Sequence, residues 1–299
     1  LRLAVGGRRS YVSIVGQPPA NGSRVALEAW HLDGMLEKRK EETEEGTVLV
    51  ARRKHCRLFL AGRRTAAVCG SHDQMQEEFR WLDRAAAAQG GTVPELVHRT
   101  WIYCRDIDNN YRGLVEGRNE CFDRYGLSPE NHYIASTGIE GCTETPGRLL
   151  HMDSLGIVGL KPGQVRYMEA PDYLSPTHLY RVAFERGARI VYGDRSHYFI
   201  SGTASIDAAG NIVHPGNVKR QTVRLSEILG APVYQDMLSP LTVALGKDIS
   251  GEPIVADVAR RAAVSKATAA RVLGGYGVVS DEVKALVRAA AAALDYRPN

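Results

Sequence analysis

Two basic side chains near the C-terminal end, Lys266 and Arg271, have the types and the spacing to bind a polar partner from one helix. The stretch KATAARVLGG predicts a helix that buries Ala269 and Val272. Its opposite side then presents Lys266, Ala267 and Arg271. Because an arginine fork can donate two parallel hydrogen bonds to the edge of a guanine base, the chemistry that suits this helix is recognition through hydrogen bonds and charge.

This helix is the second of three short helices predicted over the last fifty residues. The first, EPIVADVARRA, has apolar side chains at i, i+3, i+4 and i+7, which gives it one apolar face. Ser265 is placed to cap the second helix, and Gly274 and Gly275 end it. Ser280 caps the third, and acidic residues follow in its first turn, as the helix dipole favours. Three short helices with a tight turn between the first two predict a helix-turn-helix, whose second helix enters the major groove of DNA.

The whole segment resembles the DNA-binding headpiece of the lactose-repressor (LacI) family. The landmarks that carry the resemblance are Asp257-Val258-Ala259, Ala262-Ala263-Val264-Ser265, Thr268-Ala269-Ala270-Arg271-Val272-Leu273-Gly274, Val279-Ser280 and Tyr296-Arg297-Pro298-Asn299. The resemblance implies that base edges are reached by Lys266, Ala267 and Arg271. It implies phosphate contacts from Ser265, Thr268 and Ser280.

Three substitutions depart from the family pattern, and so does the place of the segment in the chain. Ala263 stands at the turn glycine, which costs roughly 1 kcal/mol if the backbone has a positive φ there. Ala269 replaces a core valine, and Ala270 replaces a serine that faces phosphate. In the family the headpiece stands first and continues into a hinge helix, whereas here it stands last. A single headpiece makes few phosphate contacts, so useful specificity would need dimerisation through the larger domain.

The remainder of the chain predicts a mixed α+β domain. Helical period and end signals predict helices over 72–90, 109–126 and 218–230. Runs of β-forming residues predict strands over 47–53, 56–62, 97–107, 132–139, 155–160, 164–170 and 197–207. The charge run EKRKEETEEG is expected to be a solvated loop or a helix face. Because no clean βαβ alternation exists, we expect a mixed sheet with packed helices, plus the small all-α domain at the end.

Several stretches between Arg99 and Thr222 together resemble the chorismatases, the chorismate-hydrolysing branch of the Rid (YjgF) superfamily. They are RTWIYCRDIDNNYRGLVEGRNECFDRYG, HYIASTGIEG, QVRYMEAPDYLSPTHLYRVAFERG and SGTASIDAAGNIVHPGNVKRQT. The resemblance implies a Rid-like fold with a pocket for a ring acid with two carboxylates, which needs cationic forks and hydroxyl donors. The residues that it assigns to substrate binding are Arg118, Tyr133, Arg166, Ser201 and Thr203.

The acid that would protonate the enol ether of chorismate is missing from its expected place. Chorismatases supply it as a Glu on the closing strand of the domain, a few residues after an Arg. Between Leu225 and Ala259 there is no Arg and no alternating strand that ends in Glu. Glu227 is the candidate acid that this region offers, on a predicted helix that suits the role poorly.

The predicted organisation has four parts. They are an N-terminal lobe over 1–75, a Rid-like domain over 76–245 that lacks its closing strands, a linker over 246–252, and the helix-turn-helix over 253–299. Seven Lys/Arg and four Asp/Glu lie between Pro253 and Asn299, so this short segment holds most of the chain's net charge of +4 and favours a polyanionic partner.

Composition limits the class of protein further. With 299 residues, 44% hydrophobic and 24% charged, the chain has the make-up of a soluble globular protein. It shows no membrane-length apolar run and no signal peptide. Its five cysteines form no CxxC pair, so we expect no disulfide framework, no metal, no cofactor and a cytoplasmic location.

Three hypotheses of function stay open. The first is a transcriptional regulator that binds double-stranded DNA through 253–299, with the larger domain sensing chorismate or a related acid, or forming a homo-oligomer. The second is a chorismatase that releases pyruvate from chorismate. The third is a chimeric chain that joins pieces of two unrelated genes.

Overall fold

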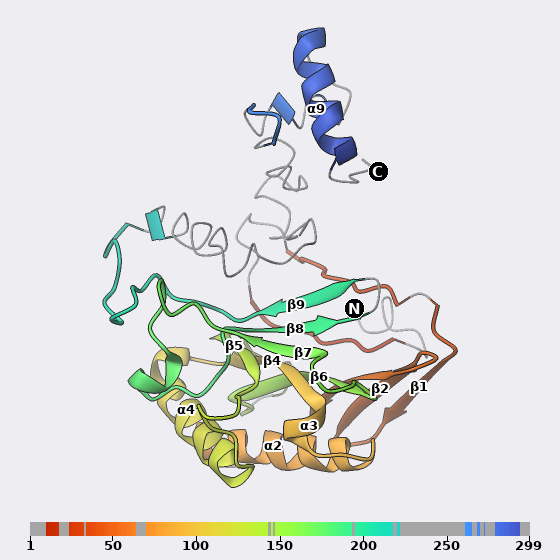
Figure 1. Cartoon of the computed structure of the whole chain (residues 1–299). Helices are drawn as coiled ribbons and strands as arrows, with labels where there is room; N and C mark the ends of the chain where they lie inside the picture. Colours follow the sequence, from red (N-terminus) through yellow and green to blue (C-terminus); the bar gives the residue numbers. More distant parts are fainter. Residues whose placement is uncertain are drawn as a thin grey trace. The chain divides into compact units, whose positions relative to one another are not determined.

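The structure is a computed structural model of the chain (Figure 1). It describes residues 10–17, 24–32, 34–63, 70–142, 145, 147–192, 195–217, 220–221, 261–264, 268–269, 272 and 279–293. The chain divides into two compact units. The first comprises Leu1–Gln17 and Leu27–Asp236, and the second comprises Pro18–Ala26 and Met237–Asn299. The domain bounds drawn from the sequence stay predictions.

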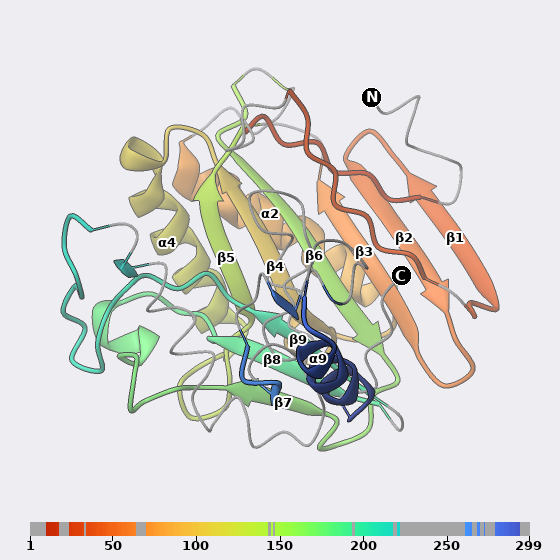
Figure 2. The ribbon, with the colours of Figure 1, turned by 90° about the horizontal axis from the view of Figure 1, so that it is seen from above.

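A six-stranded sheet forms the centre of the first unit (Figure 2). Its strands are β1 (Glu37–Glu42), β2 (Gly46–Arg52), β3 (Arg57–Arg63), β4 (Val97–Cys104), β5 (Ala135–Glu140) and β6 (Leu150–Val158). In the order β1-β2-β3-β6-β4-β5, neighbours are antiparallel except β4 and β5, which are parallel. A parallel pair needs a crossover, and the helix α4 (Ile107–Arg124) supplies it. The predicted α+β class with a mixed sheet is confirmed.

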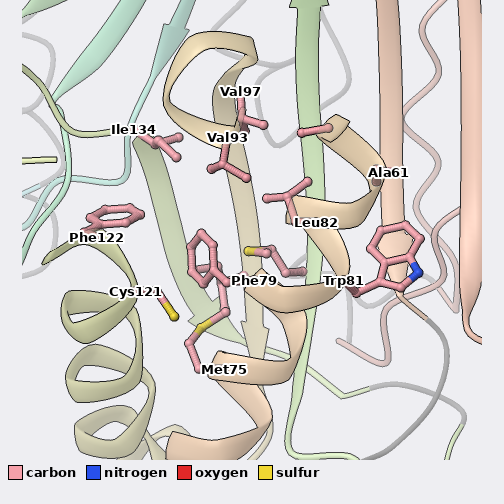
Figure 3. Close-up of a cluster of buried hydrophobic side chains, with 14 of the residues drawn as sticks. Ala61, Met75, Phe79, Trp81, Leu82, Val93, Val97, Cys121, Phe122 and Ile134 are labelled. Carbon is pink, nitrogen blue, oxygen red and sulfur yellow. The ribbon is translucent and has the colours of Figure 1, made fainter. Parts of the chain in front are cut away.

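The main apolar core lies between this sheet and two helices, α4 and α2 (Ser71–Ala87) (Figure 3). The predicted apolar side of α2 is confirmed, because Met75, Phe79 and Leu82 are all fully buried. The ring of Phe79 meets that of Phe122 edge to face, with centroids 5.5 Å apart. Burial of one such side chain stabilises the fold by roughly 1.5–3 kcal/mol. The short helix α3 (Val93–Leu96) leads directly into β4.

A second sheet in the same unit has three antiparallel strands, β7 (Val165–Met168), β8 (Gly187–Val191) and β9 (Ser196–Ile200). The 3-10 helix η1 (Thr177–Tyr180) lies in the connection from β7 to β8. A parallel bridge between Ala135 and Glu185 joins the segment before β8 to the edge strand β5. This bridge brings the segment before β8 beside the first residue of β5.

The expectation for residues 37–46 was wrong, because Glu37–Glu42 is an edge strand rather than a loop or a helix face. From Glu37 to Glu41 its side chains alternate between exposed and half-buried, and among the described strands it pairs only with β2. Charged side chains on an edge strand discourage pairing with another chain. The strand β8 was not predicted from its five residues, GARIV.

The described helix of the second unit is α9 (Asp281–Ala293), which confirms the third helix predicted from the sequence. It contributes Val287, Ala290 and Ala291 to an apolar cluster whose other buried members are Ala262, Ala269 and Val272. The burial of Ala269 and Val272 agrees with the apolar side predicted for the second helix.

Candidate functional site

The turn of the C-terminal segment has the backbone that the sequence comparison anticipated. Ala263 has a φ of 52°, in the left-handed region that favours glycine. An alanine in this conformation costs roughly 1 kcal/mol because its Cβ crowds the carbonyl oxygen. Ala262 before it is buried in the apolar cluster, and Val264 after it packs against the same cluster.

Ser280 acts as the cap of α9. The Val283 N–H donates to its Oγ at 3.4 Å, and the Lys284 N–H donates to its backbone carbonyl at 3.0 Å. Asp281 and Glu282 occupy the first turn, where the helix dipole stabilises negative charge. The Lys284 ammonium lies 2.8 Å from the Asp281 carboxylate and lowers the pKa of that group. The Ser280 hydroxyl is therefore engaged within its own helix.

The other predicted DNA-contacting residues divide between described and undescribed positions. Thr268 is half-buried and directly precedes the buried Ala269. The predictions for Ser265, Lys266, Ala267 and Arg271 fall outside the described residues, as does the candidate acid Glu227.

Two of the predicted substrate-binding residues, Ser201 and Thr203, serve a buried junction between the sheets. The Ser201 hydroxyl donates to the Glu185 carbonyl at 2.5 Å and accepts the Ser136 N–H at 2.9 Å. Arg99 donates to the same hydroxyl at 3.4 Å and to Thr137 Oγ1 at 2.5 Å. The Thr203 hydroxyl donates to the Ser201 carbonyl at 3.4 Å. These contacts hold β4, β5 and the segment before β8 together.

Tyr133 and Arg118 lie around Phe184, the residue before Glu185. Tyr133 lines a pocket together with Phe184, Glu185 and Arg186. Arg118 is buried on α4, with its guanidinium carbon 5.8 Å from the centroid of the Phe184 ring. Arg166 is exposed on β7, and neither Arg166 nor Arg118 is among the residues that line this pocket.

Two buried arginines therefore flank one aromatic ring. The Arg186 guanidinium carbon lies 5.3 Å from the same Phe184 centroid, and Arg186 and Arg118 are each 4% exposed. Arg186 donates to the Ser175 carbonyl and to the Tyr180 hydroxyl, both at 2.7 Å. Its Nε, and the Nε and one terminal nitrogen of Arg118, have no hydrogen-bond partner in the described part of the chain. A buried cation with unsatisfied donors is costly unless an anion joins it.

Around Phe184 a charged arginine lies near a carboxyl group of raised pKa. Burial lowers the pKa of Arg118 to about 10, so the guanidinium is still charged at neutral pH. Burial raises the pKa of Glu185 to about 7, against the lowering effect of the Tyr133 N–H that donates to its carboxylate at 2.7 Å. A carboxyl group that is half protonated near neutrality can donate or accept a proton.

The pocket is small in this conformation. Its volume is about 20 Å³, which holds roughly one water molecule. Its wall is formed by Pro129, Tyr133, Glu169, Ala170, Pro171, Leu174, Ser175, Pro176, Thr177, His178, Phe184, Glu185 and Arg186. A ring acid needs a larger space than this.

Glu185 and Arg186 were not among the site residues predicted from the sequence. They follow Phe184 in the stretch AFERG, and nothing in the local pattern separates them from ordinary surface charges. Their burial results from the bridge between Ala135 and Glu185, which is a contact between distant parts of the chain. A prediction of the strand β8, which begins at Gly187, would have placed both charged residues directly before a buried strand.

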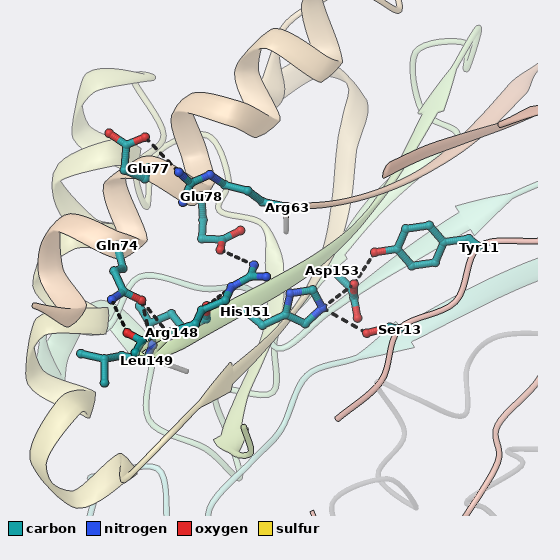
Figure 4. Close-up of polar contacts among 12 residues, drawn as sticks. Tyr11, Ser13, Arg63, Gln74, Glu77, Glu78, Arg148, Leu149, His151 and Asp153 are labelled. Atoms are coloured by element: carbon teal, nitrogen blue, oxygen red, sulfur yellow. Dashed lines mark hydrogen bonds and ion pairs between the residues drawn. The ribbon is translucent and has the colours of Figure 1, made fainter. Parts of the chain in front are cut away.

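Ser13 lies beside His151 and Asp153 of β6, but the three residues do not form a catalytic triad (Figure 4). The Ser13 hydroxyl lies 3.1 Å from His151 Nε2, and the same nitrogen lies 3.0 Å from Asp153 Oδ1. A triad needs the serine and the carboxylate on opposite ring nitrogens. Tyr11 also donates to Asp153, so the cluster anchors the N-terminal segment on the sheet.

A second buried polar pair in Figure 4, Glu78 on α2 and Arg148 before β6, is a structural tie. Their side chains are almost fully buried and 2.7 Å apart. Gln74 accepts hydrogen bonds from the backbone N–H groups of Leu149 and Leu150 beside them.

In the described part of the chain, no group of three His, Cys, Asp or Glu side chains could hold a metal ion. No helix there has the length and the apolar character to cross a membrane.

Comparison with known proteins gives a family match for the C-terminal segment of the chain. Residues 255–299 match the family described as "Bacterial regulatory proteins, lacI family", which confirms the LacI-type segment. A stretch of 44 residues is 64% identical to part of DNA translocase FtsK 2 from Ralstonia nicotianae. That stretch is 15% of this chain, and the chain spans only 6% of the length of that relative.

YjgF-family proteins are among the solved structures similar to this chain. A putative translation initiation inhibitor from Salmonella typhimurium is 12% identical, over 41% of this chain and 99% of that chain, with a TM-score of 0.33. A YjgF-family member from Neisseria meningitidis is 15% identical, over 41% and 96% of the two chains, with a TM-score of 0.30.

Proposed function

We propose that this protein is a DNA-binding regulator that contacts double-stranded DNA through residues 253–299. The single observation that carries the proposal is the match of residues 255–299 to the LacI regulator family. The apolar cluster of Ala262, Ala269, Val272 and α9, with Ala263 in the left-handed turn, supports a packed helix-turn-helix. The roles of Ser265, Lys266, Ala267, Thr268, Arg271 and Ser280 toward DNA belong to this proposal. We also propose a cytoplasmic location, which suits the free thiols of Cys56, Cys104, Cys121 and Cys142.

The test is a titration of fluorescent duplex DNA with the full chain over a range of salt concentrations. Arg271→Ala should weaken binding about 10- to 100-fold, since one bidentate base contact is worth about 1–3 kcal/mol. Arg288→Ala is the matched control, because it removes one exposed positive charge from α9 outside the second helix. Equal effects of the two substitutions, or no binding at low salt, would refute the proposal.

A second candidate function is the sensing of a small carboxylic acid by the first unit. The observation that favours it is the pair of buried arginines, Arg118 and Arg186, with unsatisfied guanidinium nitrogens around Phe184. A carboxylate would satisfy these donors and offset their charge. Chorismate or a related acid is the ligand that the sequence resemblance proposes, and dimerisation through this unit belongs to the same hypothesis.

Thermal unfolding with and without chorismate tests this candidate. Chorismate should raise the unfolding temperature of the wild type and have no effect on Arg118→Met. Arg166→Met is the control, because Arg166 is exposed, whereas Arg118 is buried beside the Phe184 ring. Ligand stabilisation that survives in Arg118→Met would exclude this site.

Chorismate hydrolysis is the alternative activity of the same pocket. Glu185 is the described carboxyl group best suited to donate the proton, because its pKa of about 7 leaves it partly protonated at neutral pH. Released pyruvate, followed with a coupled assay, measures the reaction. Activity that disappears in Glu185→Gln would favour the enzyme, and absence of pyruvate from folded protein would exclude it.

A further inference from the structure

Three turns that meet at one end of the three-stranded sheet carry an unusual excess of positive charge. They are residues 53–56 between β2 and β3, residues 159–166 at the start of β7, and residues 189–198 around the turn from β8 to β9. The basic residues of this three-turn patch are Arg53, Lys54, Lys161, Arg166, Arg189 and Arg195. Asp194 is the one acid in the three segments, so the patch carries +5 where the whole chain carries +4.

Contacts between the turns show that they form one surface. The Val191 N–H donates to the Gln164 carbonyl at 2.7 Å, which joins the second turn to the third. A Cβ added to Gly159 would lie 2.9 Å from the His55 carbonyl oxygen, so the second turn also touches the first. Burial raises the pKa of Tyr192 to about 12, and the nearby charges of Arg53 and Arg195 act in the opposite direction. The first and third turns are therefore close as well.

The cations of the patch are placed toward solvent and close to one another. Lys54, Lys161, Arg166 and Arg195 are exposed. Arg166 is directly opposite Arg189 in the register of β7 and β8, an arrangement of like charges that destabilises a sheet. Arg189 stacks over the Tyr198 ring at 5.3 Å. Exposed positive charges gathered on three joined turns suit a polyanionic partner.

We propose that the three-turn patch is a second DNA-binding surface, which contacts the phosphate backbone without reading the base sequence. Exposed lysines and arginines among tyrosines fit phosphates and sugars. DNA is favoured over an acidic protein or an anionic lipid surface because another part of the same chain matches a family of DNA-binding regulators. The surface acts independently of residues 253–299.

The experiment uses the full chain with Lys266→Ala and Arg271→Ala, which weakens the proposed recognition helix. Binding to a 30-base-pair fluorescent duplex of arbitrary sequence is measured from about 50 to 200 mM salt. Lys54→Ala, Lys161→Ala and Arg195→Ala together should reduce the slope of log affinity against log salt by roughly 2–3, because each lost phosphate contact removes about 0.9. We expect the affinity at the lowest salt to fall tenfold or more.

The control triple is Arg80→Ala, Arg84→Ala and Arg112→Ala, which removes three exposed arginines that pair with glutamates on or near α2 and α4. This control should keep the salt slope. An unchanged slope in the patch triple, or an equal change in both triples, would overturn the proposal. Unaltered binding on loss of Lys266 and Arg271 alone would count against the helix-turn-helix and not against the patch.

Discussion

The two apolar clusters of the chain differ in the size of the side chains that they bury. The cluster beneath the six-stranded sheet contains three phenylalanines, Phe59, Phe79 and Phe122, none of which is exposed. The cluster of the C-terminal segment buries four alanines and two valines. Since hydrophobic stabilisation grows with the apolar area buried, the first unit has the larger reserve. A change of given size should therefore remove a larger share of the stability of the second unit.

The largest expected effect is Phe79→Ala, which should destabilise the first unit by about 3–5 kcal/mol. The substitution leaves a cavity beside Phe122 and removes their edge-to-face contact. Denaturant unfolding followed by tryptophan fluorescence measures it, because Trp30, Trp81 and Trp101 all belong to this unit. Leu286→Ala, at an exposed position on α9, should leave that transition unchanged. A cost below about 1 kcal/mol would show that the core is not packed as described.

Acid should destabilise the first unit through His98, with no corresponding effect on the C-terminal cluster. His98 lies at a bulge in β4, is 2% exposed, and neither ring nitrogen has a hydrogen-bond partner in the described structure. Burial, assisted by His132, lowers its pKa to about 4 from an ordinary value of 6.5. The unfolded chain therefore binds a proton between these pH values that the folded chain does not, and stability falls as the pH drops from 6.5 to 4.

The size of this loss is about 3 kcal/mol, from a pKa difference of roughly 2.5. Urea unfolding of the wild type and of His98→Leu at pH 7 and pH 4.5 isolates the contribution of the histidine, since leucine keeps the site apolar. The wild type should lose more stability on acidification than His98→Leu. Equal losses would mean that His98 is solvated in the folded protein.

A smaller effect on stability is expected from a substitution in the turn beside the C-terminal cluster. Ala263→Gly should stabilise that unit by about 1 kcal/mol, because glycine adopts the positive φ without crowding. The gain in stability should appear as slower hydrogen exchange of the α9 backbone amides, measured in the full chain. Ala285→Gly, within α9, should have the opposite sign, with a cost of about 1 kcal/mol. Faster exchange in Ala263→Gly would contradict a left-handed turn.

Local patterns were sufficient to predict the features that neighbouring residues determine. The apolar side of α2 and the Ser280 cap were predicted from spacing within a few residues, and the resemblance to the LacI family placed the turn glycine at Ala263, where φ is positive. The edge strand Glu37–Glu42 was not predicted, because all six of its residues are charged and the sequence shows no alternation of apolar and polar side chains. Its strand conformation depends on pairing with β2.

The site was less predictable, because burial of a charge depends on contacts between distant segments. Nothing in the sequence distinguished Arg118 from Arg166 as substrate-binding residues. The fold buries Arg118 beside Phe184 and leaves Arg166 exposed to solvent. Arg186 was not predicted, since its burial depends on the junction at Ser201 that joins three segments. The substrate-binding roles of Arg118, Tyr133, Arg166, Ser201 and Thr203 stay proposals.

Selection of duplexes from a random pool by the full chain tests the central claim most directly. If residues 253–299 read DNA through an outward-facing second helix, the wild type should enrich a defined sequence that contains guanine, and Arg271→Ala should lose that preference. A wild type that enriches no sequence, or a substituted protein that enriches the same one equally well, would contradict the account.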